Sequence, residues 1–336
     1  MTTDHVRQAE PDTATPSPVR PPSSGRRRAV ILAAATLALI AGAATYAVRA
    51  TAPTPVADRS FDTTTPGRLL LRSGGRVASV PLANPGAPPT IGGATCDRFY
   101  TANGTTLCLV AQPGALPKTY ALLLDRKLKE TGRINLAGIP NRARVSASGR
   151  MASWTVFVTG DSYNQGGFST WTGILDTRTG YSITNMEDIP LTMNGRRYHS
   201  EDVNYWGVTF AADDNRFYAT VGTKGKTYLV EADYGAWKAR TLRENAECPS
   251  LSPDGARLVF KKRISPEKWR LHALDLATMR ETPLAEKASI DDQVAWLDND
   301  TVMYAKGKDL WSARADGTGS PAILAGQASS PSTPAR

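Results

Sequence analysis

One stretch decides the fold: Glu247-Cys248-Pro249-Ser250-Leu251-Ser252-Pro253-Asp254-Gly255-Ala256-Arg257-Leu258-Val259-Phe260. Its centre predicts a tight turn, because Pro253 presets φ, Asp254 can bond its own backbone and Gly255 takes positive φ without strain. The apolar run that ends at Phe260 predicts a strand. With 271–276 and 281–284 it predicts one four-stranded antiparallel sheet of roughly forty residues. Such a sheet cannot bury both faces alone, so it requires similar sheets stacked against it.

The same signatures recur along the chain. The turn recurs at 101–104, 146–149, 212–215 and 297–299, and the strand that ends in Asp recurs at 120–125, 171–176, 228–233 and 310–316. We expect Gly or Asn at the left-handed position of each turn, since these residues adopt it readily. A repeat of about forty to fifty residues with all-β content predicts a β-propeller.

The repeats number six, so the predicted fold class is all-β, a six-bladed β-propeller over 67–333. The blades are expected at 66–93, 94–138, 139–192, 199–246, 247–288 and 289–325. The first blade lacks an opening turn, whereas 327–332 resembles 248–252. We therefore expect the C-terminal strand to close the first blade and remove a free sheet edge; the alternative is a frayed tail.

The run 252–260, followed by Leu274-Asp275-Leu276, resembles the repeat of the TolB-type β-propeller family, the WD40-like PD40 repeats. The resemblance covers about 67–330 and is strongest in the fifth blade. It implies a propeller in an extracytoplasmic setting. The chain lacks the α/β domain that precedes the propeller in TolB, so the resemblance does not imply membership of the Tol machinery.

The N-terminal region predicts membrane attachment. We expect 1–28 to be a disordered cytoplasmic tail, and an uncharged run of transmembrane-helix length begins at Ala29 and ends at Val48. Three arginines precede this run and one follows it, which predicts a single pass with the propeller outside the cell. Residues 49–66 read as a Pro/Thr-rich linker. The alternative is a signal peptide cleaved near Ala52, which would release a secreted protein.

Charge and cysteine usage limit the possible partners. The net charge is +9, and removing the six basic and three acidic residues of the first fifty leaves 34 basic and 28 acidic ones, or +6. Without a dense basic run, we predict no nucleic-acid partner. Cys96 and Cys108 flank a predicted hairpin turn and can form a disulfide, or remain two small buried side chains. Cys248 is left over.

Catalytic signatures are absent from the sequence. It contains no G-x-S-x-G elbow, H-E-x-x-H helix, phosphate loop or metal-binding cysteine or histidine cluster. We therefore predict no catalytic residue, metal or cofactor, and expect that the protein is not an enzyme. The alternative is a propeller-based envelope hydrolase or lyase acting on a glycan or peptide.

The candidate site lies where the inner strands of the blades begin, at one mouth of the central channel. The blades offer acidic residues and a histidine on one side, and mixed charges on the other: His199, Glu201, Asp202, Glu247, Asp291 and Asp292 against Asp97, Arg98, Arg142 and Arg144. We interpret the acidic side as a site for a cation or a basic peptide segment; the alternative is a solvated rim. The repeated tryptophans are interpreted as packing between blades. The predicted function is a membrane-anchored extracytoplasmic module that binds or scaffolds a protein, peptide or envelope component through one propeller face.

Overall fold

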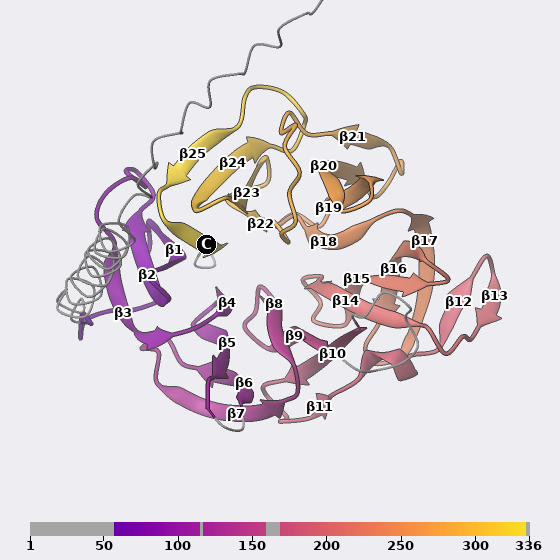
Figure 1. The fold of residues 1–336 in the computed structure, drawn as a ribbon, viewed down its shortest axis with the longest axis horizontal. Helices are drawn as coiled ribbons and strands as arrows, with labels where there is room; N and C mark the ends of the chain where they lie inside the picture. Colours follow the sequence, from indigo (N-terminus) through magenta and orange to yellow (C-terminus); the bar gives the residue numbers. More distant parts are fainter. Residues whose placement is uncertain (1–56, 115–116, 159–168, 334–336) are drawn as a thin grey trace, which may run out of the picture. The chain divides into compact units, whose positions relative to one another are not determined.

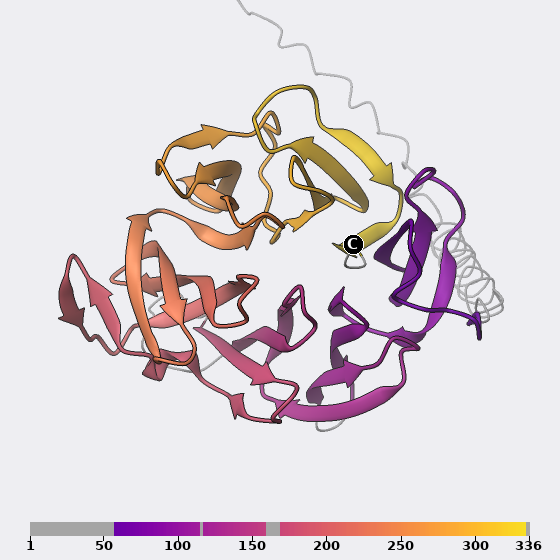
Figure 2. The same cartoon turned by 180° about the vertical axis from the view of Figure 1, so that it is seen from behind.

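The computed structural model describes residues 57–114, 117–158 and 169–333, and these residues form six sheets arranged in a ring (Figures 1 and 2). The first sheet contains β26 (Ala328–Ser332), β1 (Arg68–Ser73), β2 (Arg76–Pro81) and β3 (Thr90–Thr95). The second contains β4 (Arg98–Ala102), β5 (Thr105–Gln112), β6 (Lys118–Leu124) and β7 (Glu130–Leu136). The third contains β8 (Ile139–Val145), β9 (Met151–Val158), β10 (Ser169–Asp176) and β11 (Ser182–Ile183).

The other three sheets continue the ring. The fourth contains β14 (Asn204–Phe210), β15 (Arg216–Thr223), β16 (Lys226–Asp233) and β17 (Lys238–Glu244), extended by β12 (Leu191–Met193) and β13 (Arg196–Tyr198). The fifth contains β18 (Glu247–Leu251), β19 (Arg257–Ser265), β20 (Lys268–Asp275) and β21 (Glu281–Pro283). The sixth contains β22 (Ala295–Trp296), β23 (Thr301–Lys306), β24 (Asp309–Arg314) and β25 (Ala322–Ala325). The predicted six-bladed propeller is therefore confirmed.

The turns follow the chemistry of their sequence. In the fifth blade Gly255 has φ +71° and its N–H donates to Ser252 O at 2.9 Å, while Asp254 Oδ1 accepts from Ala256 N. Gly149 occupies the same position in the third blade, with φ +81°. The expectation of Gly or Asn is wrong in the fourth blade, where Asp214 holds the left-handed position with φ +56°, and in the sixth, where no residue of 297–299 has a positive φ. A short polar side chain tolerates that conformation as asparagine does.

The aspartate that ends the repeated strand has a structural task in the second to sixth blades. Its Oδ1 accepts backbone N–H groups of the turn that follows, and so closes the turn toward the outer strand. The same interaction occurs at Asp125, Asp176, Asp233, Asp275 and Asp316. The repeat signature is therefore a turn cap, which explains why it recurs although it lies far from the candidate site.

Packing between neighbouring sheets forms the core. Between the first and sixth blades, Leu69 and Leu71 belong to one cluster with Met303 and Leu310. Trp154 of β9 is 1% exposed and packs with residues of the second blade. The predicted packing role of the tryptophans thus holds there. A blade's central strands are covered on both faces, so β9 is buried at nearly every position instead of alternating.

The first sheet is completed from the other end of the chain. β26 lies at the inner edge of that sheet and pairs antiparallel with β1, bringing Leu70 opposite Ser332. Figure 1 shows the yellow C-terminal strand beside the indigo β1. This pairing covers the inner edge of the first sheet with a strand that follows the last blade.

The remaining predictions concern the N-terminal segments and the disulfide. The tail 1–28, the membrane run from Ala29 to Val48 and residues 49–56 of the predicted linker lie outside the described residues. The rest of that linker, 57–66, packs on the ring, because Phe61 is buried in the cluster between the first and second blades and Asp62 pairs with Arg126. Within the described ranges, no helix is long and apolar enough to cross a membrane. Cys96 and Cys108 are joined in the structure, with Cα atoms 5.5 Å apart, beside the β4–β5 hairpin.

Candidate functional site

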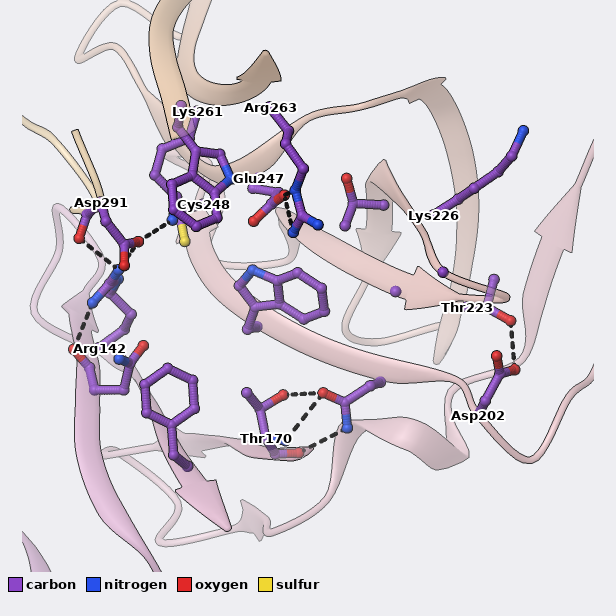
Figure 3. A pocket seen from close by; sticks show the side chains of 18 residues that line it. Arg142, Thr170, Asp202, Thr223, Lys226, Glu247, Cys248, Lys261, Arg263 and Asp291 are labelled. Atoms are coloured by element: carbon purple, nitrogen blue, oxygen red, sulfur yellow. Dashed lines mark hydrogen bonds and ion pairs between the residues drawn. The ribbon is translucent and has the colours of Figure 1, made fainter. Parts of the chain in front are cut away.

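A groove of about 500 Å³ opens on the face of the ring where the inner strands β8, β14 and β18 begin. We call it the groove, and Figure 3 shows it from close by. Its wall combines charged, polar and aromatic side chains from the third to the sixth blade: Asn141, Arg142, Phe157, Thr170, Asp202, Asn204, Trp206, Thr223, Lys226, Thr227, Glu247, Cys248, Lys261, Arg263, Trp269 and Asp291, with Gly222 and Gly225. This volume suits a small molecule or a few residues of a larger partner.

Asp291 connects two buried cations at one end of the groove. Its Oδ1 lies 2.5 Å from Lys261 Nζ and 3.5 Å from Arg142 Nη2. Lys261 is 3% exposed and Arg142 7%, whereas the Asp291 side chain is 63% exposed. Figure 3 shows Asp291 facing both basic side chains. Although burial acts in the opposite direction, Lys261 and Arg142 lower the pKa of Asp291, so it is ionised at neutral pH.

Glu247 is engaged by a different cation. It lies at the start of β18, its side chain is 5% exposed, and its Oε1 accepts from Arg263 Nη2 at 3.0 Å. Arg263 also contacts the face of Trp269, 5.4 Å from the ring centroid, and Lys261 Nζ lies 4.7 Å from the same centroid. Both basic side chains therefore make cation–π contacts with Trp269.

Two glycines shape the aromatic and backbone parts of the wall. A Cβ on Gly222 would lie 2.8 Å from the Trp206 ring, so the absence of a side chain lets that indole lie against β15. Gly207 has φ +67°, and a Cβ there would lie 2.7 Å from Cys248 Cα. β14 and β18 can therefore approach closely beneath the groove. Cys248, the remaining cysteine, is buried at this crossing.

The opposite end of the groove is a hydrogen-bond network in which the one carboxylate, Asp202, is bonded to neutral donors. Asn204 Oδ1 accepts from Thr170 N at 3.1 Å, and Asn204 Nδ2 donates to Thr170 O at 3.1 Å. Asp202 accepts from Thr223 Oγ1 at 2.7 Å and from the Lys224 backbone N–H. Burial opposes this effect, but the hydrogen bonds lower the pKa of Asp202. These polar groups already satisfy one another.

The structure separates the six predicted site residues. Asp202, Glu247 and Asp291 line the groove. Asp292 is buried, lies 3.8 Å from Arg98, and lines a smaller cavity of about 30 Å³ instead. Glu201 and His199 are exposed and are not part of the groove wall.

The expected division of the mouth into an acidic and a basic side does not occur. Arg142 and Arg98 reach across the channel to Asp291 and Asp292, and Arg144 donates to Val294 O at 2.9 Å. The ring brings the third blade opposite the sixth, so the charges that the sequence places on two arcs meet as pairs. The carboxylates are therefore largely neutralised.

Sequence reasoning missed most of the wall. Trp206 and Trp269, interpreted as core, line the groove, and Lys261 and Arg263 were not singled out. One signal was available, because two basic residues two positions apart in a strand share a face. After Arg257, β19 has an apolar run that ends at Phe260, and it then presents Lys261 and Arg263 where the blade meets the mouth.

Comparison with known proteins bears on the fold. No protein-family model matches the chain, and no curated protein matches its sequence. Among solved structures, TolB from Acinetobacter baumannii is similar with a TM-score of 0.56 and 15% identity, over 80% of this chain and 67% of that one. A putative TolB from Agrobacterium tumefaciens gives 0.47 at 12% identity over 76% and 87%, respectively. A puromycin-hydrolyzing peptidase of Mycobacterium tuberculosis gives 0.48 at 13% identity, over 79% of this chain and 44% of that one.

Proposed function

We propose that this propeller of TolB-like fold is a binding module that engages a protein, peptide or envelope component through the groove. The observation that carries the proposal is the groove itself, which joins aromatic walls to fixed polar and charged groups on one face of the ring. Concave sites of this size and mixed lining are typical of ligand recognition, and a rigid ring of sheets holds such a wall in place.

Binding is favoured over catalysis by the residues that the groove lacks. The described ranges contain His199 and His272; His199 is exposed, His272 contacts Glu281 of β21 at 2.7 Å, and neither lines the groove. A hydrolase of the Ser–His type needs its base within hydrogen-bond reach of the nucleophile. Within the described residues, no group of three metal-ligating side chains is present either. These observations count against the Ser–His and metal-dependent forms of the hydrolase or lyase alternative.

The proposed setting is the outer face of the cell membrane. The apolar run from Ala29 to Val48 would anchor the chain with its N-terminus in the cytoplasm, and the part of the predicted linker before residue 57 would connect this anchor to the ring. In an oxidising compartment the Cys96–Cys108 disulfide would persist. Protease digestion of intact cells tests this arrangement: the ring is expected to be accessible and 1–28 protected.

Site-specific photo-crosslinking tests the proposed function. The full chain is produced in its own cells with p-benzoyl-L-phenylalanine in place of Lys226, an exposed residue of the groove rim. The matched control replaces Ala147, which is exposed in the β8–β9 turn at the opposite mouth. We expect a discrete adduct from position 226 that is absent from position 147. The second substitution Trp206→Ala should abolish that adduct.

Two results would reject the groove as the binding site. One is an adduct of the same mass from both positions, and the other is an adduct from position 226 that Trp206→Ala leaves unchanged while the melting temperature is also unchanged. The hydrolase or lyase alternative would be supported instead by a captured envelope glycan or peptide that the purified full chain cleaves, and by loss of that cleavage in the same Trp206→Ala variant.

A further inference from the structure

We infer that one end of the groove, formed by Arg142, Lys261, Asp291 and Cys248, receives a carboxylate of the ligand. We call this part the anion end. The inference rests on the proposed function, since it assigns the chemistry that the same groove recognises. It also reverses the sign expected from the sequence, which favours a cation or a basic segment at this mouth.

The charges of the anion end favour a negative ligand group. There, the buried Arg142 of the third blade and the buried Lys261 of the fifth face one carboxylate, that of Asp291. Two positive groups against one negative group leave an excess of one positive charge. A buried excess charge is unfavourable unless a counter-charge is present, so the anion end is complementary to a single negative group.

The hydrogen bonds of Arg142 within the protein are long. Arg142 is more than nine-tenths buried; its Nη1 donates to Asn141 O at 3.1 Å, and its Nη2 reaches Asp291 O and Oδ1 only at 3.3 and 3.5 Å. Charge-assisted bonds between guanidinium and carboxylate are usually near 2.8 Å. Among the described residues, no group accepts from Arg142 Nε. A buried guanidinium with an unused donor and two long contacts can form a stronger bond with a ligand oxygen.

The remaining carboxylates of the groove are committed elsewhere, which argues against a cation as the ligand. Glu247 is bonded to Arg263, and Asp202 is bonded to Thr223 and to the Lys224 backbone. Only Asp291 has an exposed side chain, and two basic residues already share it. A cation bound to Asp291 would have to compete with Arg142 and Lys261, which already neutralise that carboxylate.

The neighbouring wall indicates what should be attached to the carboxylate. Phe157 and Trp206 line the groove together with Arg142 and Cys248. Aromatic faces favour a flat or apolar body, which would lose contact with water as it packs against them. The inferred ligand group is therefore a carboxylate on a short, planar or apolar body.

Three matched probes test the sign of the charge on the full chain. Phenylacetate carries the inferred anion, phenylacetamide is its neutral counterpart, and phenethylammonium carries the opposite charge. Binding is measured by isothermal titration or by ligand-observed NMR. We expect phenylacetate to bind at least about tenfold more tightly than either of the others, and more tightly than inorganic phosphate.

Replacing the carboxylate of Asp291 distinguishes an anion site from a cation site, because the two hypotheses predict opposite changes in ligand affinity. Asp291→Asn frees both buried cations, so phenylacetate should bind about tenfold more tightly. If the mouth were a cation site, the same change would weaken phenethylammonium binding and leave phenylacetate unbound. Glu201→Gln is the matched control, because it removes a nearby exposed carboxylate that does not line the groove. It should leave phenylacetate binding within about twofold of the unmodified chain.

A second variant keeps the inference testable if Asp291→Asn alters the fold. Lys261→Met retains the apolar stem of the side chain and removes its charge, and should weaken phenylacetate binding about tenfold. The inference is overturned if no probe binds, if phenylacetamide binds as tightly as phenylacetate, or if phosphate binds best. In each case a groove-specific photo-adduct from position 226 would still support the proposed binding function, so the two failures are distinguishable.

Discussion

The ion pair between Arg150 and Asp176 should contribute a measurable, pH-dependent part of the stability of the ring. Asp176 ends β10 and is 3% exposed, and Arg150 Nη2 donates to its Oδ2 at 2.6 Å while Nε donates to Oδ1 at 3.1 Å. These bonds, aided by the Arg178 backbone N–H, lower the pKa of Asp176 from 3.8 to about 2. We expect Asp176→Asn to destabilise the protein at pH 7.

The magnitude follows from the pKa shift. Lowering the pKa of Asp176 from 3.8 to about 2 corresponds to about 2.4 kcal/mol, which we reduce to about 2 kcal/mol because the Arg150 side chain is 30% exposed and solvent screens the pair. The folded state has the lower pKa, so this stabilisation is complete above about pH 4. It is lost as the pH falls toward 2, where the folded state also takes up the proton.

Urea unfolding of the full chain and of Asp176→Asn, measured at several pH values, tests this reasoning. The difference in unfolding free energy should be about 2 kcal/mol at pH 7 and should shrink steadily below pH 4. Asp188→Asn is the control. Because Asp188 is exposed, this substitution should leave the unfolding free energy unchanged at every pH measured. A pH-independent difference, or none at pH 7, would refute the assignment of the stabilisation to the charged carboxylate.

Three further changes test the ring itself. Deleting 327–336 removes β26 and leaves the inner edge of β1 unpaired, so the melting temperature should fall by several degrees and aggregation should increase. Gly173→Ala places a Cβ 2.3 Å from the buried Trp154 ring and should destabilise the protein by about 1–3 kcal/mol in urea unfolding. Denaturing, non-reducing alkylation should label one thiol per chain, and Cys96→Ser should expose Cys108 to the reagent while lowering stability by about 2–3 kcal/mol.

Each of these three experiments has a matched control. Deletion of 334–336 alone leaves β26 intact and should not change the melting temperature. Gly93→Ala places its Cβ in open space and should be nearly neutral. After reduction the unmodified chain should show three reactive thiols. An unchanged melting temperature without β26, equal effects of the two glycine substitutions, or three thiols before reduction would contradict the corresponding interpretation.

The fold could be read from the sequence because its determinants are local. Gly255 and Asp254 specify a turn through their own conformational preferences, and Asp275 caps the next turn through residues two and three positions away. When such units repeat, counting them gives the blade number. The left-handed Asp214 shows the limit of this reasoning, because several short polar residues tolerate that conformation.

The groove could be predicted only in part because its determinants are not local. Asp291 and Asp292 are consecutive, yet one is exposed and shared by two cations while the other is buried beside Arg98. Arg142 lies 149 residues from Asp291 in the chain, and only closure of the ring makes them neighbours. A pattern of charges along the sequence indicates which residues reach the mouth, but it does not indicate which of them neutralise one another.

The most direct test of the account is an experimental structure of the full chain together with the partner captured from position 226. The account predicts that the partner occupies the groove beside Trp206 and places a carboxylate oxygen within about 3 Å of Arg142 or Lys261. A partner bound at the opposite mouth near Ala147, or along the outer strands of the blades with the groove empty, would contradict it.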